Sequence, residues 1–264
     1  MRALRQAFPQ GEVPVPEVFG WRRHEGQNFI YMSLIHGPTL REAWSSLTEG
    51  DKQSISVGLS GIVWSLQQIT HDSPGMLIGS INGGSVQDRY FKLDYEEGPF
   101  LTVRSFNDWL LAAATRQRPG PEGIKTFDGS YRDYLPDDGS VYFAHGDLTL
   151  GNIILSGNPG AMKIEAIIDW EQAGFYPEYW EWSKLLYGVE YSHEWREGGW
   201  VDKAALLLAG LFNSCPRMTT DVFLPQFPNA GGVYVSSGAI CSSQHGLWGV
   251  GAAMLPHWIK VVTP

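Results

Sequence analysis

Apolar and polar residues alternate at the start of the chain in a way that predicts extended structure. Residues 18–22 and 28–34 are two such runs, and the polar turn 24–27 joins them, which predicts a β-hairpin. Before the hairpin, Val13-Pro14-Val15-Pro16 predicts an extended connector, because each proline disfavours helical geometry in the residue before it. Residues 1–8 predict a short helix, because Pro9 and Gly11 would end it.

After Gly37-Pro38 the pattern becomes helical. Residues 51–69 carry apolar side chains at intervals of three and four, which predicts a helix with one buried face. Thr39 is the expected N-cap of a shorter helix through Leu47, and Ser105, with Asp108 three residues later, is the expected cap of a helix to Arg116. The other predicted segments are helices over 177–187 and 195–211, a long loop over 72–100, and a tail over 212–264 with few charges and no helical periodicity.

The stretch 141–171 joins apolar runs to three oxygen-bearing side chains. A short apolar strand leads into His145-Gly146-Asp147, and Asn152 follows Asp147 by five positions. A Gly/Pro turn at 156–161 separates two further apolar runs, the second of which ends at Asp169. We expect these two runs to form a hairpin that brings Asp169 back beside Asn152.

This spacing is typical of phosphoryl transfer from ATP. One carboxylate orients the attacking hydroxyl, and an Asn with a second carboxylate holds Mg²⁺ against the phosphates, with the Asp and Asn of the catalytic loop five positions apart. The alternative is that each Asp or Asn is only a turn residue after a strand. For one of them alone that alternative is favoured, whereas the ordered set of Asp147, Asn152 and Asp169 favours the catalytic interpretation.

Composition narrows the class of protein. The 264 residues carry a net charge of −9, which argues against a nucleic-acid-binding surface, and their 43% hydrophobic content is enough for a sizeable core. Cys215 and Cys241 are the only cysteines and have no metal-ligand spacing, so a cytoplasmic setting is expected. No apolar run has the length of a signal peptide core or a membrane span, so no membrane partner is expected.

The motifs HGDLTLGN and IIDWEQAGFYPEYWEWSKLLYG resemble those of the aminoglycoside phosphotransferase/choline kinase-like family, particularly its fungal members. The segments VPVPEVFGW, IYMSLIHGPTL and IGSINGG extend the resemblance, which covers about residues 1–210. It implies an α+β, protein kinase-like fold of the aminoglycoside phosphotransferase type, with an incomplete N-lobe sheet and a mostly helical C-lobe. The implied organisation is an N-lobe remnant and hinge at 1–36, a C-lobe at 37–211 and a divergent tail at 212–264.

The same resemblance implies cofactors, partners and roles. The function would be transfer of the γ-phosphoryl group of ATP to the hydroxyl of a small molecule, with Mg²⁺ as the metal and no nucleic acid as partner. Asp147 would be the catalytic base, and Asn152 and Asp169 would ligate Mg²⁺. The cofactor-binding set would be completed by three hinge residues that hold the adenine through their main chain, namely Tyr31, Met32 and Ser33.

Other residues of the motifs have less specific implied roles. His145 is expected to support the loop rather than to transfer protons. Glu171 is expected to orient the metal site, to contact substrate or to be only a solvated carboxylate. Tyr176, Tyr179 and Trp180 are expected either to wall the substrate or, as the safer interpretation, to pack in the core.

The chain also departs from the family pattern at both ends. The family pairs a strand lysine with a helix glutamate to grip the phosphates, but here no Lys precedes Lys52 and no Gly-rich phosphate loop is present. The expectation is a gene product that lacks a 5′ coding segment and carries unrelated sequence at its 3′ end. An alternative function is therefore a catalytically impaired pseudokinase or truncated product that acts as a binding scaffold.

Overall fold

A computed structural model describes residues 1–70, 78–88, 98–115, 132, 135–187, 193–197, 200 and 259–261. Most of residues 119–139, most of the helix expected over 195–211 and all of the tail except 259–261 lie outside the described residues. Within the described part, no helix combines the length and the apolar character needed to cross a bilayer.

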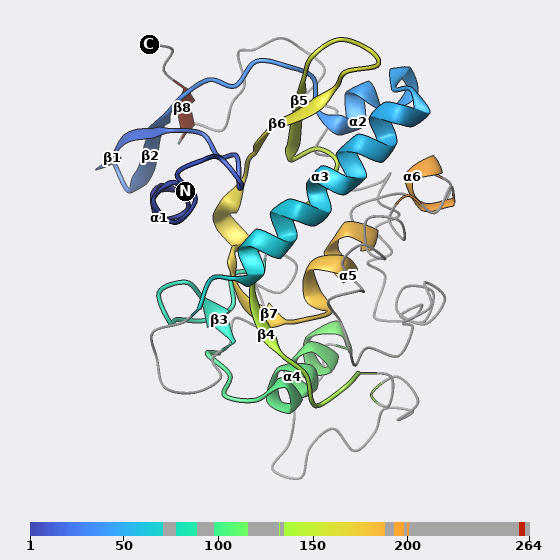
Figure 1. Cartoon of the computed structure of the whole chain (residues 1–264). Helices are drawn as coiled ribbons and strands as arrows, with labels where there is room; N and C mark the ends of the chain where they lie inside the picture. The colour runs from blue at the N-terminus through green and yellow to red at the C-terminus, as the bar shows by residue number, and fades with distance from the viewer. Residues whose placement is uncertain are drawn as a thin grey trace.

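Helices and short strands alternate along the described part, which gives a mixed α+β fold (Figure 1). The long helix α3 crosses the middle of the molecule, with the β1–β2 hairpin on one side and α5 on the other. The helices are α1 (Arg2–Ala7), α2 (Leu40–Ala43), α3 (Glu49–Gln67), α4 (Val103–Thr115), α5 (Trp180–Tyr187) and α6 (Glu194–Glu197). The strands are β1 (Val18–His24), β2 (Gln27–Met32), β3 (Gly79–Ser80), β4 (Val141–Ala144), β5 (Ile153–Ser156), β6 (Lys163–Ile167), β7 (Gly174–Pro177) and β8 (Ile259–Val261).

The strands form three small sheets rather than one. The first has the order β1-β2-β8, the second β3-β7-β4, and β5 pairs with β6 alone. Both expected hairpins are confirmed. Strands β1 and β2 pair antiparallel around a turn at Glu25 and Gly26, both with positive φ, and β5 pairs antiparallel with β6. Strand β8 adds in parallel to the other edge of β2, and β3 gives the expected loop 72–100 one short strand.

Two helix starts differ from the sequence predictions. Thr48 is the N-cap of α3, and Asp51, expected as the first residue, closes a capping box with it. Thr102 rather than Ser105 caps α4, because its hydroxyl accepts the Ser105 N–H at 3.1 Å. The expected cap at Thr39 is confirmed, where Glu42 completes another capping box.

The helix expected from Pro177 begins later. Residues 174–177 form β7, which pairs with β4 so that Pro177 lies opposite Val141. Proline has no N–H to donate, but at the end of a strand this costs little of the hydrogen-bond ladder. The residue before a proline prefers extended geometry, which also suits a strand. Helix α5 therefore starts at Trp180.

The main core lies between α3 and the strands β4, β5 and β6. The buried face of α3 (Ile55, Leu59, Ile62, Val63 and Leu66) is as the sequence predicts, and it packs in one cluster with residues of β4, β5 and β6. A second cluster joins α4 to β7 and α5. Tyr176, Tyr179 and Trp180 are all buried there, which agrees with the core-packing interpretation.

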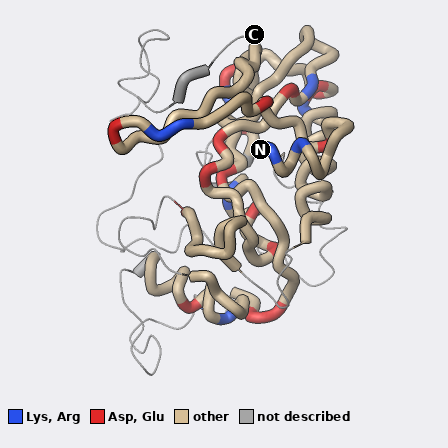
Figure 2. Tube along the Cα trace, turned by 90° about the vertical axis from the view of Figure 1, so that its left-hand side faces the viewer, with Lys and Arg blue, Asp and Glu red and all other residues tan. Residues whose placement is uncertain are grey.

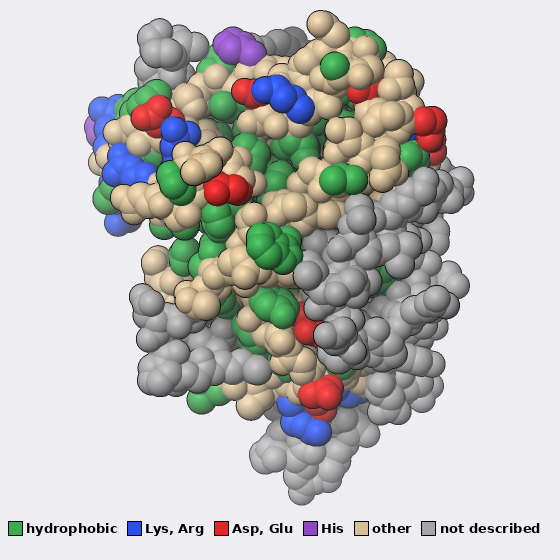
Figure 3. Space-filling model, in the orientation of Figure 1, with side chains coloured by type: hydrophobic (Ala, Val, Ile, Leu, Met, Phe, Trp, Pro, Cys, Tyr) green, Lys and Arg blue, Asp and Glu red, His purple; other side chains and the backbone are tan. Residues whose placement is uncertain are grey.

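The hairpin β1–β2 is tied to the body of the molecule at its base. The Pro14 carbonyl accepts the N–H of Ile167 on β6 at 2.8 Å, so the extended connector lies against the strand that leads to Asp169. Glu17 and Ser33 then link the two strands through main-chain and hydroxyl hydrogen bonds of 2.8 and 3.0 Å. Beyond this point the hairpin extends away from the body (Figure 2) and carries Arg22 and Arg23 on its outer part, where basic side chains gather in Figure 3.

Candidate functional site

The loop after β4 is held in place by a buried histidine. The His145 side chain is fully buried, and its Nε2 lies 2.9 Å from the Ile168 carbonyl oxygen while its Nδ1 accepts the Asp147 N–H at 3.1 Å. Burial lowers the pKa of His145 to about 4, so the ring is neutral at pH 7 and Nε2 carries the proton. His145 is thus a loop support, as expected, and a poor proton acceptor.

Gly146 lets the loop pass close to the following turn. Its φ is +76°, and a β-carbon there would lie 2.6 Å from the carbonyl oxygen of Gln172. Only glycine fits this combination of backbone geometry and contact without strain. The main chain therefore turns sharply between His145 and Asp147.

The structure brings Asp147 and Asn152 together. The Asn152 amide nitrogen donates to the Asp147 main-chain oxygen at 2.8 Å and to its carboxylate Oδ2 at 3.3 Å. Two further main-chain hydrogen bonds, through Thr149, close the loop between them. With its nitrogen directed at Asp147, Asn152 keeps its amide oxygen for another ligand.

The β5–β6 hairpin places Asp169 near Asn152. Ile153 lies opposite Ile167, and the Ile168 N–H donates to the Asn152 carbonyl oxygen at 3.0 Å. Asp169 follows in the left-handed region with φ 64°, its side chain exposed and not capping the 3-10 turn Trp170–Gln172. Asp and Asn tolerate this conformation better than most residues.

These two residues fit a magnesium ion of the phosphate-bridging kind. Among the described residues, no three His, Cys, Asp or Glu side chains group as metal ligands. Mg²⁺ in kinases needs few protein oxygens, because phosphates and water complete its six ligands. One partly exposed amide oxygen and one exposed carboxylate, on neighbouring strand ends, meet that requirement.

The three expected hinge residues lie apart from this loop, in the sheet of β1 and β2. Tyr31 and Met32 end β2, and Ser33 follows. The Ser33 N–H donates to the Glu17 carbonyl oxygen. The guanidinium carbon of Arg22 lies over the Tyr31 ring, 5.9 Å from the ring centroid. Their role in adenine binding stays a prediction.

A buried group of charged residues behind the loop was missed by the sequence reasoning. Glu181 on α5 accepts hydrogen bonds from the main-chain N–H groups of His145 and, at 3.4 Å, Gly146. One turn later, Lys184 donates to Asp88 at 2.7 Å and to Gln172 at 3.4 Å. We call His145, Asp147, Glu181, Lys184 and Asp88 the loop cluster. Its sequence signal was a pair of charged residues, Glu181 and Lys184, three positions apart in an otherwise uncharged helix.

Burial and neighbouring charges shift the titration of Glu181. Burial raises its pKa to about 7, although the two N–H donors and the Lys184 charge act in the opposite direction. The Asp147 charge raises the pKa further. The second carboxylate oxygen, Oε1, finds no hydrogen-bond partner in the described part of the chain.

A cavity of about 350 Å³ opens beside the 3-10 turn Trp170–Gln172. Its walls come from α1, from the turn after β3, from Phe143 on β4 and from the 3-10 turn that follows Asp169. Its polar lining consists of Ser80, Asn82, Gln87 and Glu171. Glu171, for which three roles were open, therefore faces a space large enough for a small molecule.

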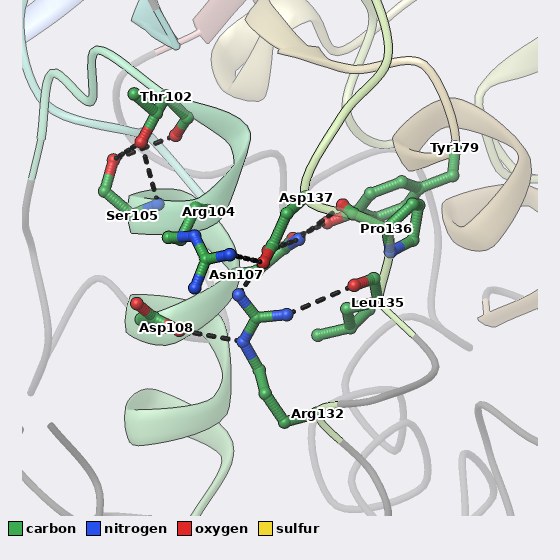
Figure 4. Close-up of polar contacts among 10 residues, drawn as sticks. All are labelled: Thr102, Arg104, Ser105, Asn107, Asp108, Arg132, Leu135, Pro136, Asp137 and Tyr179. Atoms are coloured by element: carbon green, nitrogen blue, oxygen red, sulfur yellow. Dashed lines mark hydrogen bonds and ion pairs between the residues drawn. The ribbon is translucent and has the colours of Figure 1, made fainter.

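A second polar group, also missed, lies between α4 and the segment that leads to β4 (Figure 4). Arg132 donates to Asp108 at 2.8 Å and also pairs with Asp137, which Arg104 contacts at 2.9 Å. Asn107, fully buried, donates to the Pro136 carbonyl oxygen at 2.7 Å and accepts from the Tyr179 hydroxyl. We call Arg104, Asn107, Asp108, Arg132 and Asp137 the Arg132 cluster. Asp108 thus pairs with an arginine instead of completing a helix cap.

Comparison with known protein families identifies the architecture. Residues 1–210 match the family described as the phosphotransferase enzyme family. No curated protein matches the chain. The HGD loop and the strand that ends at Asp169 both fall inside the matched range.

Solved structures of aminoglycoside and choline/ethanolamine kinases also resemble the chain. The GDP complex of aminoglycoside 2'-phosphotransferase-IIIa is 15% identical, with a TM-score of 0.49, and the match covers 79% of this chain and 64% of that one. The Streptomyces rimosus phosphotransferase APH(3'')-Id, in complex with ADP and streptomycin, is 17% identical with a TM-score of 0.43, over 80% of this chain and 74% of that one. A choline/ethanolamine kinase family protein from Mesorhizobium loti is 16% identical with a TM-score of 0.38, over 78% and 58%. The chain thus spans less than two thirds of the first of these structures.

Proposed function

The chain belongs to the phosphotransferase enzyme family, with a kinase-like α+β fold, and on that premise we propose that it transfers the γ-phosphoryl group of ATP to a hydroxyl group of a small molecule. The observation that carries the proposal is the arrangement of the loop and hairpin. The Asn152 side-chain amide donates a hydrogen bond to the Asp147 main-chain oxygen. The Asn152 carbonyl oxygen accepts the N–H of Ile168, the residue before Asp169. We further propose a cytoplasmic setting, consistent with the two widely spaced cysteines.

Asp147 is the proposed catalytic base. Its carboxylate orients the acceptor hydroxyl and takes its proton as the new O–P bond forms and the bond to the ADP leaving group breaks. Asn152 fixes the carboxylate through the 3.3 Å hydrogen bond to Oδ2. His145 cannot replace Asp147 in this role, because its Nδ1 accepts the Asp147 N–H and its Nε2 lies against the Ile168 carbonyl oxygen.

Asn152 and Asp169 are the proposed Mg²⁺ ligands. Bound there, the ion would neutralise charge on the phosphates. The Asn152 amide oxygen and the exposed Asp169 carboxylate would supply its protein ligands. Tyr31, Met32 and Ser33 remain the proposed contacts of the adenine.

The cavity lined by Glu171 is the proposed entry for the acceptor. Three neutral polar side chains and one carboxylate suit a molecule with hydroxyl or amino groups. The cavity adjoins Trp170, whose ring packs against His145 with centroids 4.5 Å apart, so it lies next to the catalytic loop.

A second candidate function is that of a binding protein without turnover. It is favoured by the ion pairs that the buried lysines form with carboxylates. Lys52 donates to Glu194 at 2.8 Å and Lys184 to Asp88 at 2.7 Å, so both buried lysines of the described part hold carboxylates. Neither is placed to grip a phosphate, a contact that contributes strongly to the rate of phosphoryl transfer.

Calorimetry with Mg·ATP tests the proposal. The wild-type chain is compared with Asp169→Asn, which removes the ligand charge but tolerates the left-handed backbone. Asp138→Asn is the matched control, because Asp138 is also an exposed aspartate but lies before β4, outside the proposed metal site and the cavity. We expect Mg-dependent binding that Asp169→Asn weakens at least about tenfold and Asp138→Asn leaves unchanged. Equal binding by wild type and Asp169→Asn would overturn the metal assignment.

Turnover separates the two candidate functions. ADP release is followed with a panel of small alcohols and amino alcohols, with Asp147→Asn as the inactive reference. Release above that reference supports the transferase. Tight Mg·ATP binding with no release for any acceptor would favour the binding protein.

A further inference from the structure

Helix α5 carries the only described contacts between a side-chain carboxylate and the main chain of the HGD loop. Glu181 Oε2 accepts the N–H groups of His145 and Gly146, directly before Asp147. An ionised carboxylate makes stronger hydrogen bonds than a neutral one, by roughly a factor of two. The loop is therefore held most firmly when Glu181 is charged.

Keeping Glu181 charged is difficult in this surrounding. Its side chain is buried, and Oε1 has no hydrogen-bond partner in the described residues. Asp147 on the loop, Asp88 on the segment after β3 and the Tyr176 ring on β7 all face the same space, and none of them supplies positive charge. His145 is neutral, because burial lowers its pKa to about 4.

Among the described residues, Lys184 supplies positive charge to this space. It lies one turn after Glu181 on α5, a spacing that puts two side chains on the same helix face. The ammonium is buried with Asp88, at 2.7 Å, and its charge lowers the pKa of Glu181. The Lys184 ammonium is thus paired with Asp88 while its charge also acts on Glu181.

We propose that Lys184 is a positioning residue for the catalytic loop, because its ammonium shifts Glu181 toward the ionised form and the ionised carboxylate fixes the main chain that carries Asp147. Asp88 sets the strength of this effect, since it competes with Glu181 for the same charge. The catalytic meaning rests on the proposed function, whereas the electrostatic coupling between Lys184 and Glu181 does not.

The His145 main-chain N–H reports on the coupling without any need for turnover. Ala144–His145 is the only Ala-His step in the sequence, so labelling alanine with ¹³C at the carbonyl and histidine with ¹⁵N gives one HNCO cross-peak for this amide. Its shift is followed from pH 5.5 to 9. The wild-type amide is expected to titrate near pH 7, where Glu181 changes charge, well away from the His145 ring.

Three variants are expected to move the midpoint of this titration in different ways. In Lys184→Met the midpoint rises by about one pH unit or more, since the favourable charge is gone. In Asp88→Asn it falls, because Asp88 no longer competes with Glu181 for the Lys184 charge. In Lys184→Arg, which keeps the charge, it returns toward the wild-type value. Lys52→Met is the matched control, because Lys52 is equally buried and ion-paired but lies on α3 with Glu194.

The outcomes decide the inference. An unchanged midpoint in Lys184→Met, or the same rise in Lys52→Met, overturns it. If Lys184→Met does not fold, Asp88→Asn decides, and a midpoint that fails to fall overturns the inference. Shifted midpoints in a chain that binds no Mg·ATP would support the coupling and count against the proposed function.

Discussion

The loop cluster and the Arg132 cluster are built from similar residues but differ in burial and in charge balance. The Arg132 cluster has two arginines for two aspartates, and the Arg104 side chain at its edge is 70% exposed. The loop cluster has one ammonium for three carboxylates, and the Lys184 and Asp88 side chains are only 7% and 1% exposed. Balanced, hydrated charges hold two segments together, whereas unbalanced buried charges make one carboxylate hard to ionise.

This difference shows where the fold accepts an energetic cost. An ion pair at the surface contributes little and is replaceable. A buried carboxylate whose pKa is raised destabilises the folded state at neutral pH, and such costs concentrate at functional sites. The four predictions below test the comparison, from the largest expected effect to the smallest.

The first prediction compares one aspartate from each cluster. Asp147 accepts a hydrogen bond from Asn152, and Asp137 accepts one from Arg132. Asp147→Asn is expected to lower ATP-dependent turnover by a factor of about 10²–10⁴, because the acceptor loses its base while the hydrogen bond from Asn152 can be kept. Asp137→Asn in the Arg132 cluster is expected to leave turnover within about twofold. Steady-state ADP release measures both. Equal losses would remove the functional distinction between the clusters.

The second prediction concerns the close contact at Gly146. Gly146→Ala is expected to lower the free energy of unfolding by about 3 kcal/mol, because positive φ and a β-carbon 2.6 Å from the Gln172 oxygen both add strain. Gly160→Ala has φ +88° but no atom within 4 Å, so about 1 kcal/mol is expected there. Urea unfolding measures both, and a similar cost at the two sites would show that the contact is not a constraint.

The third prediction concerns pH. Because the folded-state pKa of Glu181 rises from 4.5 to about 7, the protonated form is favoured by folding, and stability is lost as pH rises through that range. Relative to wild type, Glu181→Gln should therefore gain about 2 kcal/mol of stability between pH 5 and pH 8. Urea unfolding at the two pH values tests this. A constant difference would mean that Glu181 titrates normally.

The smallest effect is expected at Arg132. The pairs are partly hydrated, with the Asp108 side chain 51% exposed, so Arg132→Ala should cost at most about 1 kcal/mol and turnover should not change. The cost should shrink further in 1 M salt, because screening weakens exposed pairs. Thermal unfolding at low and high salt measures it. A larger cost that does not change with salt would mean that the charges of the Arg132 cluster are shielded from solvent, as those of the loop cluster are.

The sequence was sufficient for features encoded by local spacing. The hairpins β1–β2 and β5–β6, the buried face of α3 and the meeting of Asp147 with Asn152 follow from short-range patterns. It was insufficient where distant segments meet, since nothing at Asp88 indicates a partner on α5, 96 residues later. The error at Ser105 was of another kind, because Thr102 is an equally good cap and only the geometry decides between them.

The connection at the base of the β1–β2 hairpin has a mechanical consequence. The hydrogen bond from Ile167 fixes Pro14 to the strand before Asp169, while Glu17 and Ser33 bind the two hairpin strands to each other. Any swing of the hairpin must then turn about the two connections that flank it, with both strands moving as a single lever. One connection runs from Pro14 to Glu17, and the other runs from Ser33 to Pro38, whose carbonyl accepts the Leu155 N–H at 2.9 Å. Such a motion would carry Tyr31 and Met32 through an arc and leave Asp169 stationary.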